Sequence, residues 1–267
     1  MDEYTSSDDI LRVEDMVDIS NEYKKEVKYI KKLLKMYTNM TGIKVPQHKI
    51  EIVNLEDKAS AMVIANSYSG INDIAIAYDS SRLKEGIQAD TLCMTVWHEV
   101  AHLIDIVNYN KIKDDQGRGY EFTVWTEYNA RYTSMKLYMQ YKNEMKEMFM
   151  GWLKHSQLDA INNILENRLS KLNSTYENGS IDKMRKKFSI IYELTQYFGA
   201  YSLFEELDYE YFKDAEQFID LSDYNLGLSQ VKELYGKLQS LRSIKDVFCN
   251  NDYRGLRSAI LQLFMLV

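Results

Sequence analysis

The sequence is poor in residues that stop helices or cross-link chains. Among its 267 residues there is one proline, Pro46, and there are two cysteines, Cys93 and Cys249. Because a single proline leaves few points at which a helix must end, the chain is expected to be mainly helical. Two cysteines cannot form the disulfide framework typical of small secreted domains, so a reducing compartment is expected.

Positive charge and long apolar runs are also scarce. Lysine and arginine number 33 against 40 aspartates and glutamates, a net charge of −7, which argues against a nucleic-acid-binding face and against an anionic lipid surface as partner. No apolar run reaches the length of about 18 residues that a membrane helix needs. The first residues, MDEYTSSDDILRVEDM, show no basic-then-apolar leader. We therefore expect a cytoplasmic protein without nucleic-acid or membrane partners.

Apolar spacing predicts an α+β protein that is mostly helical. Residues 48–79 contain three strand-like runs, HKIEIVN, SAMVIANSY and INDIAIAYD, which we expect to be joined by hairpin-like turns. Helical spacing is found over 12–40, 90–108, 120–149, 155–172, 182–206, 228–240 and 253–266. A small N-terminal sheet and a large helical remainder predict two lobes, residues 1–118 and 119–267.

The helix predicted over residues 90–108 is apolar on nearly all sides but has one polar face. The polar residues between Leu92 and Val107 are Thr95, His98, Glu99, His102 and Asp105. Their spacing places them on the same side of a helix. A helix that is apolar all round is normally buried, and unpaired ionisable groups in such a place are costly. This face therefore needs a partner.

The simplest partner is a metal ion. His98 and His102 are four positions apart, so they project side by side and can each approach one zinc ion to about 2.0–2.1 Å. Glu99 lies beside them, placed to hold a water on the metal and to act as a general base, the logic of the H-E-x-x-H motif. The alternative is that the histidines are core residues and the motif is accidental.

A catalytic zinc usually has three protein ligands and leaves its fourth position to water. Glu127, in EFTVWTEYNARYTSM, follows His102 by 25 positions (127 − 102), which leaves room for a turn and an antiparallel return. Glu121 is the competing candidate. The other histidines, His48 and His155, lie far from the motif, and we expect surface or capping roles for them.

The motif HEVAH, followed by a glutamate in TEYNAR, resembles the gluzincin branch of zinc metallopeptidases. The resemblance implies Zn²⁺ on His98, His102 and Glu127, with Glu99 activating the attacking water. The E-x-x-A run from Glu127 to Ala130 is similar to a common form of the third-ligand motif, and H-E-x-x-H-x-x-D, ending here at Asp105, also occurs among relatives. The likeness covers roughly residues 48–135 and is greatest to compact metallopeptidases of bacterial genomes and mobile elements.

The resemblance also implies a zincin-like fold, in which a sheet precedes the active-site helix. In the family an extended peptide pairs with the edge strand of that sheet, and INDIAIAYDSSRL resembles this strand. The substrate is then a peptide or protein.

Further roles near the site stay open at this stage. Asp105, one turn beyond His102, is expected either to accept the N–H of a liganded histidine and fix its tautomer or to pair with another N–H group or an arginine. The family's usual oxyanion-stabilising tyrosine, histidine or arginine has four candidates: Arg131, Tyr132, Tyr120 and His155. For Arg131 and Tyr132 the alternative is an ordinary helix face with a salt bridge.

The 21 tyrosines of the chain are expected to serve core packing with hydroxyls that reach solvent, and an aromatic substrate groove is the alternative. Three functions are consistent with these patterns. The first is a zinc-dependent peptidase, the second an inactive zincin-fold protein that binds or regulates a partner around a structural zinc, and the third a helical scaffold without metal.

Overall fold

A computed structural model describes residues 17–55, 60–65, 74–84, 89–112, 119–145, 183–206, 228–241 and 253–266. The helix predicted over 155–172, as well as His155 and Cys249, lies outside these ranges. The chain divides into two compact units, Met1–Val107 and Asn108–Val267. The division between residues 118 and 119 stays a prediction from the sequence.

The first unit contains a three-stranded sheet in the order β1-β3-β2. Strand β1 (Lys49–Val53) runs parallel to β3 (Ile74–Asp79), with Ile52 beside Tyr78, and β2 (Ala61–Ala65) runs antiparallel to β3, with Met62 beside Ala77. The prediction that a hairpin-like turn joins the first two strands is therefore wrong, because β1 pairs with β3. Every residue of β3 is buried, so the most apolar strand takes the centre of the described sheet, where both of its faces can be covered.

The position of β3 also corrects the expectation that INDIAIAYD forms an edge strand. Both sides of β3 are hydrogen-bonded, one to β1 and one to β2. A strand paired on both sides has no free backbone groups to offer a peptide. The outer strands of the described sheet are β1 and β2.

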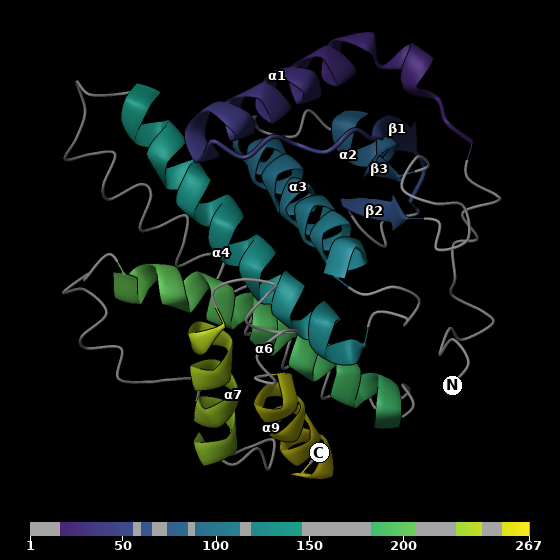
Figure 1. Ribbon diagram of the computed structural model, residues 1–267. Helices are drawn as coiled ribbons and strands as arrows, with labels where there is room; N and C mark the ends of the chain where they lie inside the picture. The colour runs from purple at the N-terminus through teal and green to yellow at the C-terminus, as the bar shows by residue number, and fades with distance from the viewer. Residues whose placement is uncertain are drawn as a thin grey trace. The chain divides into compact units, whose positions relative to one another are not determined.

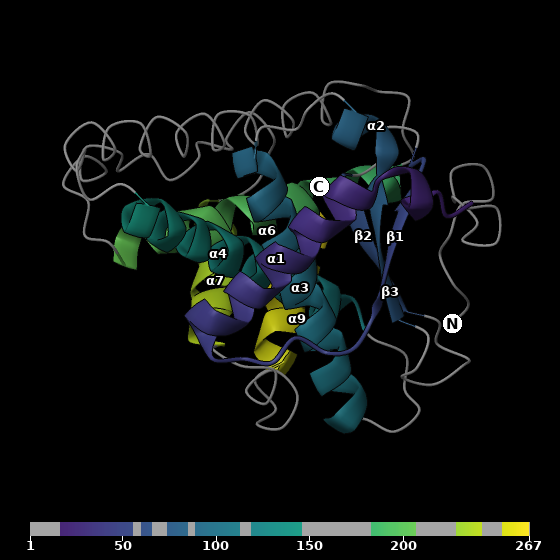
Figure 2. The ribbon, with the colours of Figure 1, turned by 90° about the horizontal axis from the view of Figure 1, so that it is seen from above.

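Two long helices, α1 (Lys24–Thr41) and α3 (Ala89–Ile112), lie on the same side of the sheet, as Figures 1 and 2 show. The apolar face of α1 buries Ile30, Leu33 and Tyr37, and the indole Nε1 of Trp97 on α3 donates to the carbonyl of Leu33 at 3.1 Å. Helix α1 ends at Gly42, whose φ of 70° is the left-handed conformation that glycine adopts most easily.

Helix α1 begins later than the predicted residue 12. Residues 20–22 form a short 3-10 helix, η2 (Ser20–Glu22), and the Ile19 N–H donates to the Ile52 carbonyl of β1 at 2.8 Å. The Asp18 carboxylate accepts the Ile52 N–H at 3.2 Å. The segment before α1 is therefore bonded to the outer edge of β1 at Ile52. A short helix, α2 (Ser80–Lys84), follows β3.

The second unit is helical throughout its described part. It contains α4 (Tyr120–Met145), α6 (Lys183–Glu206), α7 (Leu228–Ser240) and α9 (Tyr253–Leu266). Helix α4 packs against α6, and α7 lies beside α9 (Figure 1). The predicted bounds of α6, α7 and α9 agree with these to within one residue. An α+β fold that is mostly helical is thus confirmed. Within the described ranges, no helix has the length and apolar character needed to cross a membrane.

Candidate metal centre

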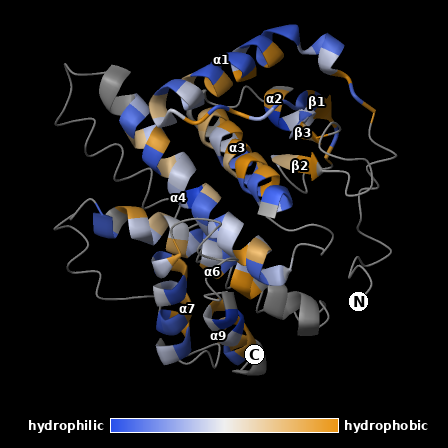
Figure 3. Cartoon of the chain, viewed as in Figure 1, coloured by the Kyte–Doolittle hydropathy of each residue, from blue (hydrophilic) through white to orange (hydrophobic). Residues whose placement is uncertain are grey.

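Helix α3 is buried, as its apolar sequence predicts. The side chains of Cys93, Val96, Trp97, Val100 and Leu103 are fully enclosed, and Figure 3 shows the helix as a mostly hydrophobic ribbon. Cys93 is a free thiol, 3.8 Å from the hydroxyl oxygen of Tyr29 on α1. A buried free thiol of this kind packs as a small apolar residue.

The polar face of α3 is also largely removed from solvent. Glu99 is 7% exposed, His102 9% and Asp105 6%, while His98 is partly buried. The Nε2 atoms of His98 and His102 lie 3.0 Å apart, and the two rings meet edge to face with their centroids 4.5 Å apart. The two histidines therefore direct the same ring nitrogen toward one point.

Glu127 on α4 completes a set of metal-ligating groups. Ligand atoms of His98, His102 and Glu127 all lie within 4.8 Å of one another. With three ligand atoms this close together, the group could hold a metal ion. Two nitrogens bound to one tetrahedral zinc at about 2.0–2.1 Å are about 3.3–3.4 Å apart. The 3.0 Å between the imidazole nitrogens is close to that value, so two nitrogens and one carboxylate fit a divalent transition metal.

The competing glutamate is engaged elsewhere. Glu121, in the first turn of α4, has its Oε1 3.3 Å from the Nε of Arg257 on α9. The Nδ1 of His48, directly before β1, lies 2.8 Å from the carbonyl oxygen of Pro46. These contacts are structural, and neither residue belongs to the group formed around His98.

The carboxylate of Glu127 is held by a glutamine that the sequence did not single out. The Nε2 of Gln196, on α6, donates to Glu127 Oε2. The Oε1 of the same amide accepts from Arg131 Nε at 2.6 Å. Because Arg131 can only donate, it fixes which end of the Gln196 amide faces Glu127. Gln196 is an ordinary residue in a helix of mixed composition, and no sequence spacing identifies it.

Glycine at position 199 allows α6 to approach α4 beside this glutamate. A Cβ atom at Gly199 would lie 2.6 Å from the backbone oxygen of Tyr128 and 2.8 Å from Arg131 Cβ. Both distances are too short for a side chain, so only glycine fits this close approach. The approach brings Gln196 within hydrogen-bonding reach of Glu127.

Tyr78, on β3, is a second residue that sequence reasoning missed. Its side chain is 1% exposed, and its hydroxyl has no hydrogen-bond partner among the described residues. Burial raises the pKa of Tyr78, and the charge of Glu99 raises it further. The signal that could have identified it is the strand face Ile74, Ile76, Tyr78, in which this hydroxyl is the one polar group.

Asp105 and the candidate oxyanion residues have contacts of their own. Burial raises the pKa of Tyr37 on α1, and the charge of Asp105 adds to that shift. The role of Asp105 toward a histidine stays a prediction. The Tyr132 hydroxyl donates to Glu206 Oε2 and accepts from Lys136 Nζ at 3.0 Å. Burial raises the pKa of Tyr120.

Comparisons with protein-family models, with curated proteins and with solved structures find no match for this chain. The gluzincin resemblance therefore rests on the motif residues themselves.

Proposed function

We propose that the chain is a zinc-dependent metallopeptidase of zincin-like fold. His98, His102 and Glu127 hold the zinc, and Glu99 is the general base. The observation that carries the proposal is the convergence of these three ligand groups within 4.8 Å, with Glu99 next in sequence to the first of them.

Zinc bound at such a set lowers the pKa of water to about 7 and polarises a carbonyl group. Glu99 supplies the proton transfers. Its carboxylate accepts a proton as the water oxygen bonds to the peptide carbonyl carbon, and returns it to the nitrogen as the carbon–nitrogen bond breaks. The products are a carboxylic acid and an amine. Since Glu99 is buried, its charge acts with little screening by solvent.

Other residues of the chain position these groups. Gln196 orients the Glu127 carboxylate, and Arg131 orients Gln196. Supporting bonds of this kind usually tune a metal site through the geometry of its ligands. In this proposal Arg131 has a positioning role, and the stabilisation of the oxyanion is left to other groups.

Strand β2 is the candidate for pairing with a substrate backbone. The outer edge of β1 is taken, because Ile52 bonds through its carbonyl to the Ile19 N–H and through its N–H to Asp18. Among the described residues, no backbone group bonds to the outer edge of β2. An extended peptide added there would continue the sheet.

Metal content tests the proposal first. Elemental mass spectrometry of the purified wild type should give about one zinc per chain, the count expected for a single His₂Glu site. His98→Ala should lose it, while His48→Ala, which removes a histidine outside the site, should keep it. A wild type that binds no zinc when zinc is supplied would overturn the proposal. Zinc binding with no cleavage of any peptide library would favour the inactive binding module instead.

A further inference from the structure

Helix α1 of the first unit has one face made of lysines, which we call the lysine face. Its members are all exposed: Lys24, Lys25, Lys28, Lys31, Lys32 and Lys35. At 3.6 residues per turn they fall within about 120° of the helix circumference. Ile30, Leu33 and Tyr37 lie on the opposite side of the helix, where they are buried. The packing of α1 therefore turns all six lysines toward solvent.

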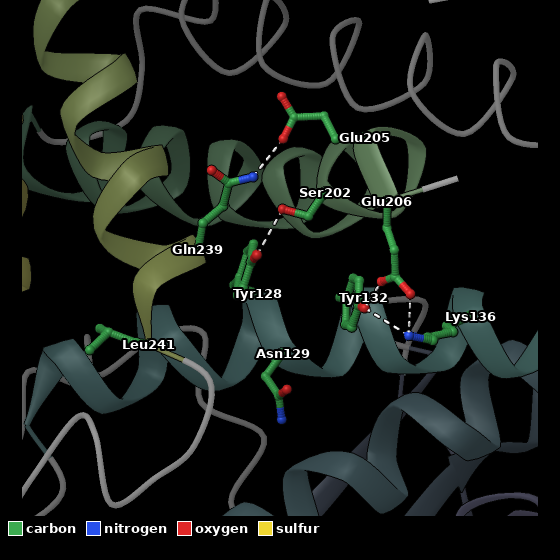
Figure 4. A pocket seen from close by; sticks show the side chains of 9 residues that line it. All are labelled: Tyr128, Asn129, Tyr132, Lys136, Ser202, Glu205, Glu206, Gln239 and Leu241. Atoms are coloured by element: carbon green, nitrogen blue, oxygen red, sulfur yellow. Dashed lines mark hydrogen bonds and ion pairs between the residues drawn. The ribbon is translucent and has the colours of Figure 1, made fainter. Parts of the chain in front are cut away.

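The charge of the lysine face is not compensated within the described part of the chain. Glu26 is the acidic residue of α1, and helical spacing places it near the apolar side. Among the residues that the structure describes, none of the six ammonium groups forms an ion pair or a hydrogen bond. Lys136 on α4 shows the opposite case in Figure 4, where its Nζ is paired with Glu206 Oε1 at 2.5 Å and donates to the Tyr132 hydroxyl at 3.0 Å.

The rest of the chain is acidic, and this limits what the lysine face can bind. The net charge is −7, so the chain without these six lysines carries −13 (−7 − 6). A long nucleic acid or an anionic membrane would extend beyond α1 and meet this negative charge. A membrane-bound helix also inserts its apolar side into the lipid, and that side of α1 is buried. A short anion avoids both obstacles.

We propose that the lysine face binds a short acidic segment of a protein partner, with its carboxylates against the ammonium groups. From Lys24 to Lys35 the helix rises about 16.5 Å, at 1.5 Å per residue. An extended peptide covers about 3.3–3.6 Å per residue, so a run of about five residues rich in aspartate and glutamate matches this length. Lysine offers a point charge on a flexible stem, which selects for charge and not for one exact sequence. The inference is independent of the metal centre.

Direct binding tests the lysine face. The probe is hexaglutamate with a rhodamine label, titrated with the full chain and followed by fluorescence anisotropy at low salt, with labelled hexaglutamine as its neutral counterpart. We expect hexaglutamate to bind and Lys28→Gln/Lys31→Gln to weaken it about fivefold, the effect of losing two exposed ion pairs. Lys232→Gln/Lys237→Gln removes the same charge from exposed positions of α7 and should leave binding unchanged. Equal binding of the two peptides, or equal losses in the two double variants, would overturn the inference.

Salt dependence gives a second readout of the same contact. Exposed charges are screened over about 10 Å at 0.1 M salt and over about 3 Å at 1 M. Hexaglutamate should therefore be released as salt rises toward 1 M. Binding that does not change with salt would overturn a contact between exposed charges.

Other occupants of the lysine face give distinguishable results. A short DNA duplex, or vesicles of phosphatidylcholine and phosphatidylserine, could bind more tightly than hexaglutamate and lose affinity in Lys28→Gln/Lys31→Gln. That outcome would overturn the assignment to an acidic peptide. The chain itself has an acidic start, which includes Asp8 and Asp9. Stronger binding of hexaglutamate to Asp8→Asn/Asp9→Asn would mean that this start competes for the face, and would overturn the assignment to a separate partner.

Discussion

Helices α3 and α6 are both 24 residues long and largely buried, but they bury different kinds of polar group. In the described part of α6 the enclosed polar residues are neutral, and they bond within α6 or to neighbouring helices. Thr195 donates to Ile191 at 2.6 Å, Gln196 bridges Glu127 and Arg131, and Ser202 meets Tyr128.

The polar face of α3 is ionisable instead, with two histidines and two carboxylates gathered on one side. Neutral groups that bond within the chain stabilise packing at modest cost. Four ionisable groups placed together are costly to bury unless an ion joins them. In the proposed metallopeptidase, α3 therefore carries the chemistry and α6 supports it.

The variant Glu99→Gln tests the proposed role of α3 and should have the largest effect. If Glu99 is the base, kcat should fall about 10²–10⁴-fold, the usual contribution of a general base. Zinc content should remain that of the wild type, because Glu99 is not a ligand in the proposed site. Peptide hydrolysis and elemental analysis check both parts, with the exposed Glu22→Gln as the control. Retained hydrolysis in Glu99→Gln would mean that Glu99 is not the general base.

The supporting role of α6 is tested by Gln196→Leu. Loss of the amide should weaken zinc binding about 10–100-fold, as for other partners of metal ligands. Competition with a chelator of known affinity measures this change. Gln262→Leu, at an exposed position of α9, is the matched control. Unchanged affinity in Gln196→Leu would mean that Glu127 needs no support.

Two glycine substitutions measure how closely α6 must approach α4. Gly199→Ala should destabilise the protein by about 1–3 kcal/mol, because the new methyl group overlaps Tyr128 O and Arg131 Cβ. Gly236→Ala on α7 meets nothing within 4 Å and should stabilise it by about 0.5–1 kcal/mol through helix propensity. Urea unfolding of both variants gives the comparison, and effects of the same sign would contradict it.

Asp79, a buried carboxylate outside α3, serves as a comparison. Asp79 is fully buried but accepts the Leu55 N–H at 3.0 Å and the Ser81 hydroxyl. Burial alone would raise the pKa of Asp79, but these bonds and the N–H groups of Ser81 and Arg82 lower it below 3.8. The ionised form therefore stabilises the fold above the unfolded pKa, and this contribution is lost as pH falls through the folded value.

Asp79→Asn should thus cost about 1 kcal/mol near neutral pH, because a neutral amide replaces a charged acceptor in these hydrogen bonds. The difference from wild type should narrow as pH falls below about 3.8, because the wild-type carboxyl is then protonated too. Urea unfolding at several pH values measures it. A difference that stays constant down to about pH 2.5 would contradict this account.

The part of the site on α3 could be predicted because its polar residues are rare within an apolar helix. The spacing of His98, Glu99, His102 and Asp105 is a local property, so it needs no knowledge of the fold. The bounds of α6, α7 and α9 could be predicted because the helical spacing of apolar residues is also a local property. Glu127 was a harder prediction, since glutamate is common in helices and only the number of ligands favoured it.

What the sequence could not provide depends on contacts between distant segments. The order β1-β3-β2 follows from which strand is covered on both faces, which alternation alone does not reveal. Tyr78 and Gln196 have no distinguishing sequence pattern, and their significance depends on contacts that only the folded chain makes. In the tyrosine-rich helices, polar and aromatic residues are so frequent that no single one stands out.

Among the described residues, each unit contains one buried indole whose N–H is bonded to a backbone carbonyl: Trp97 to Leu33 at 3.1 Å, and Trp125 to Leu241 at 3.0 Å. The chain has three tryptophans, and the third is Trp152. With Trp152→Phe as background, replacing either of the others leaves a single emitter in a chosen unit. Fluorescence can then follow the melting of each unit separately, and transitions that do not coincide would reveal two cooperative blocks within one chain.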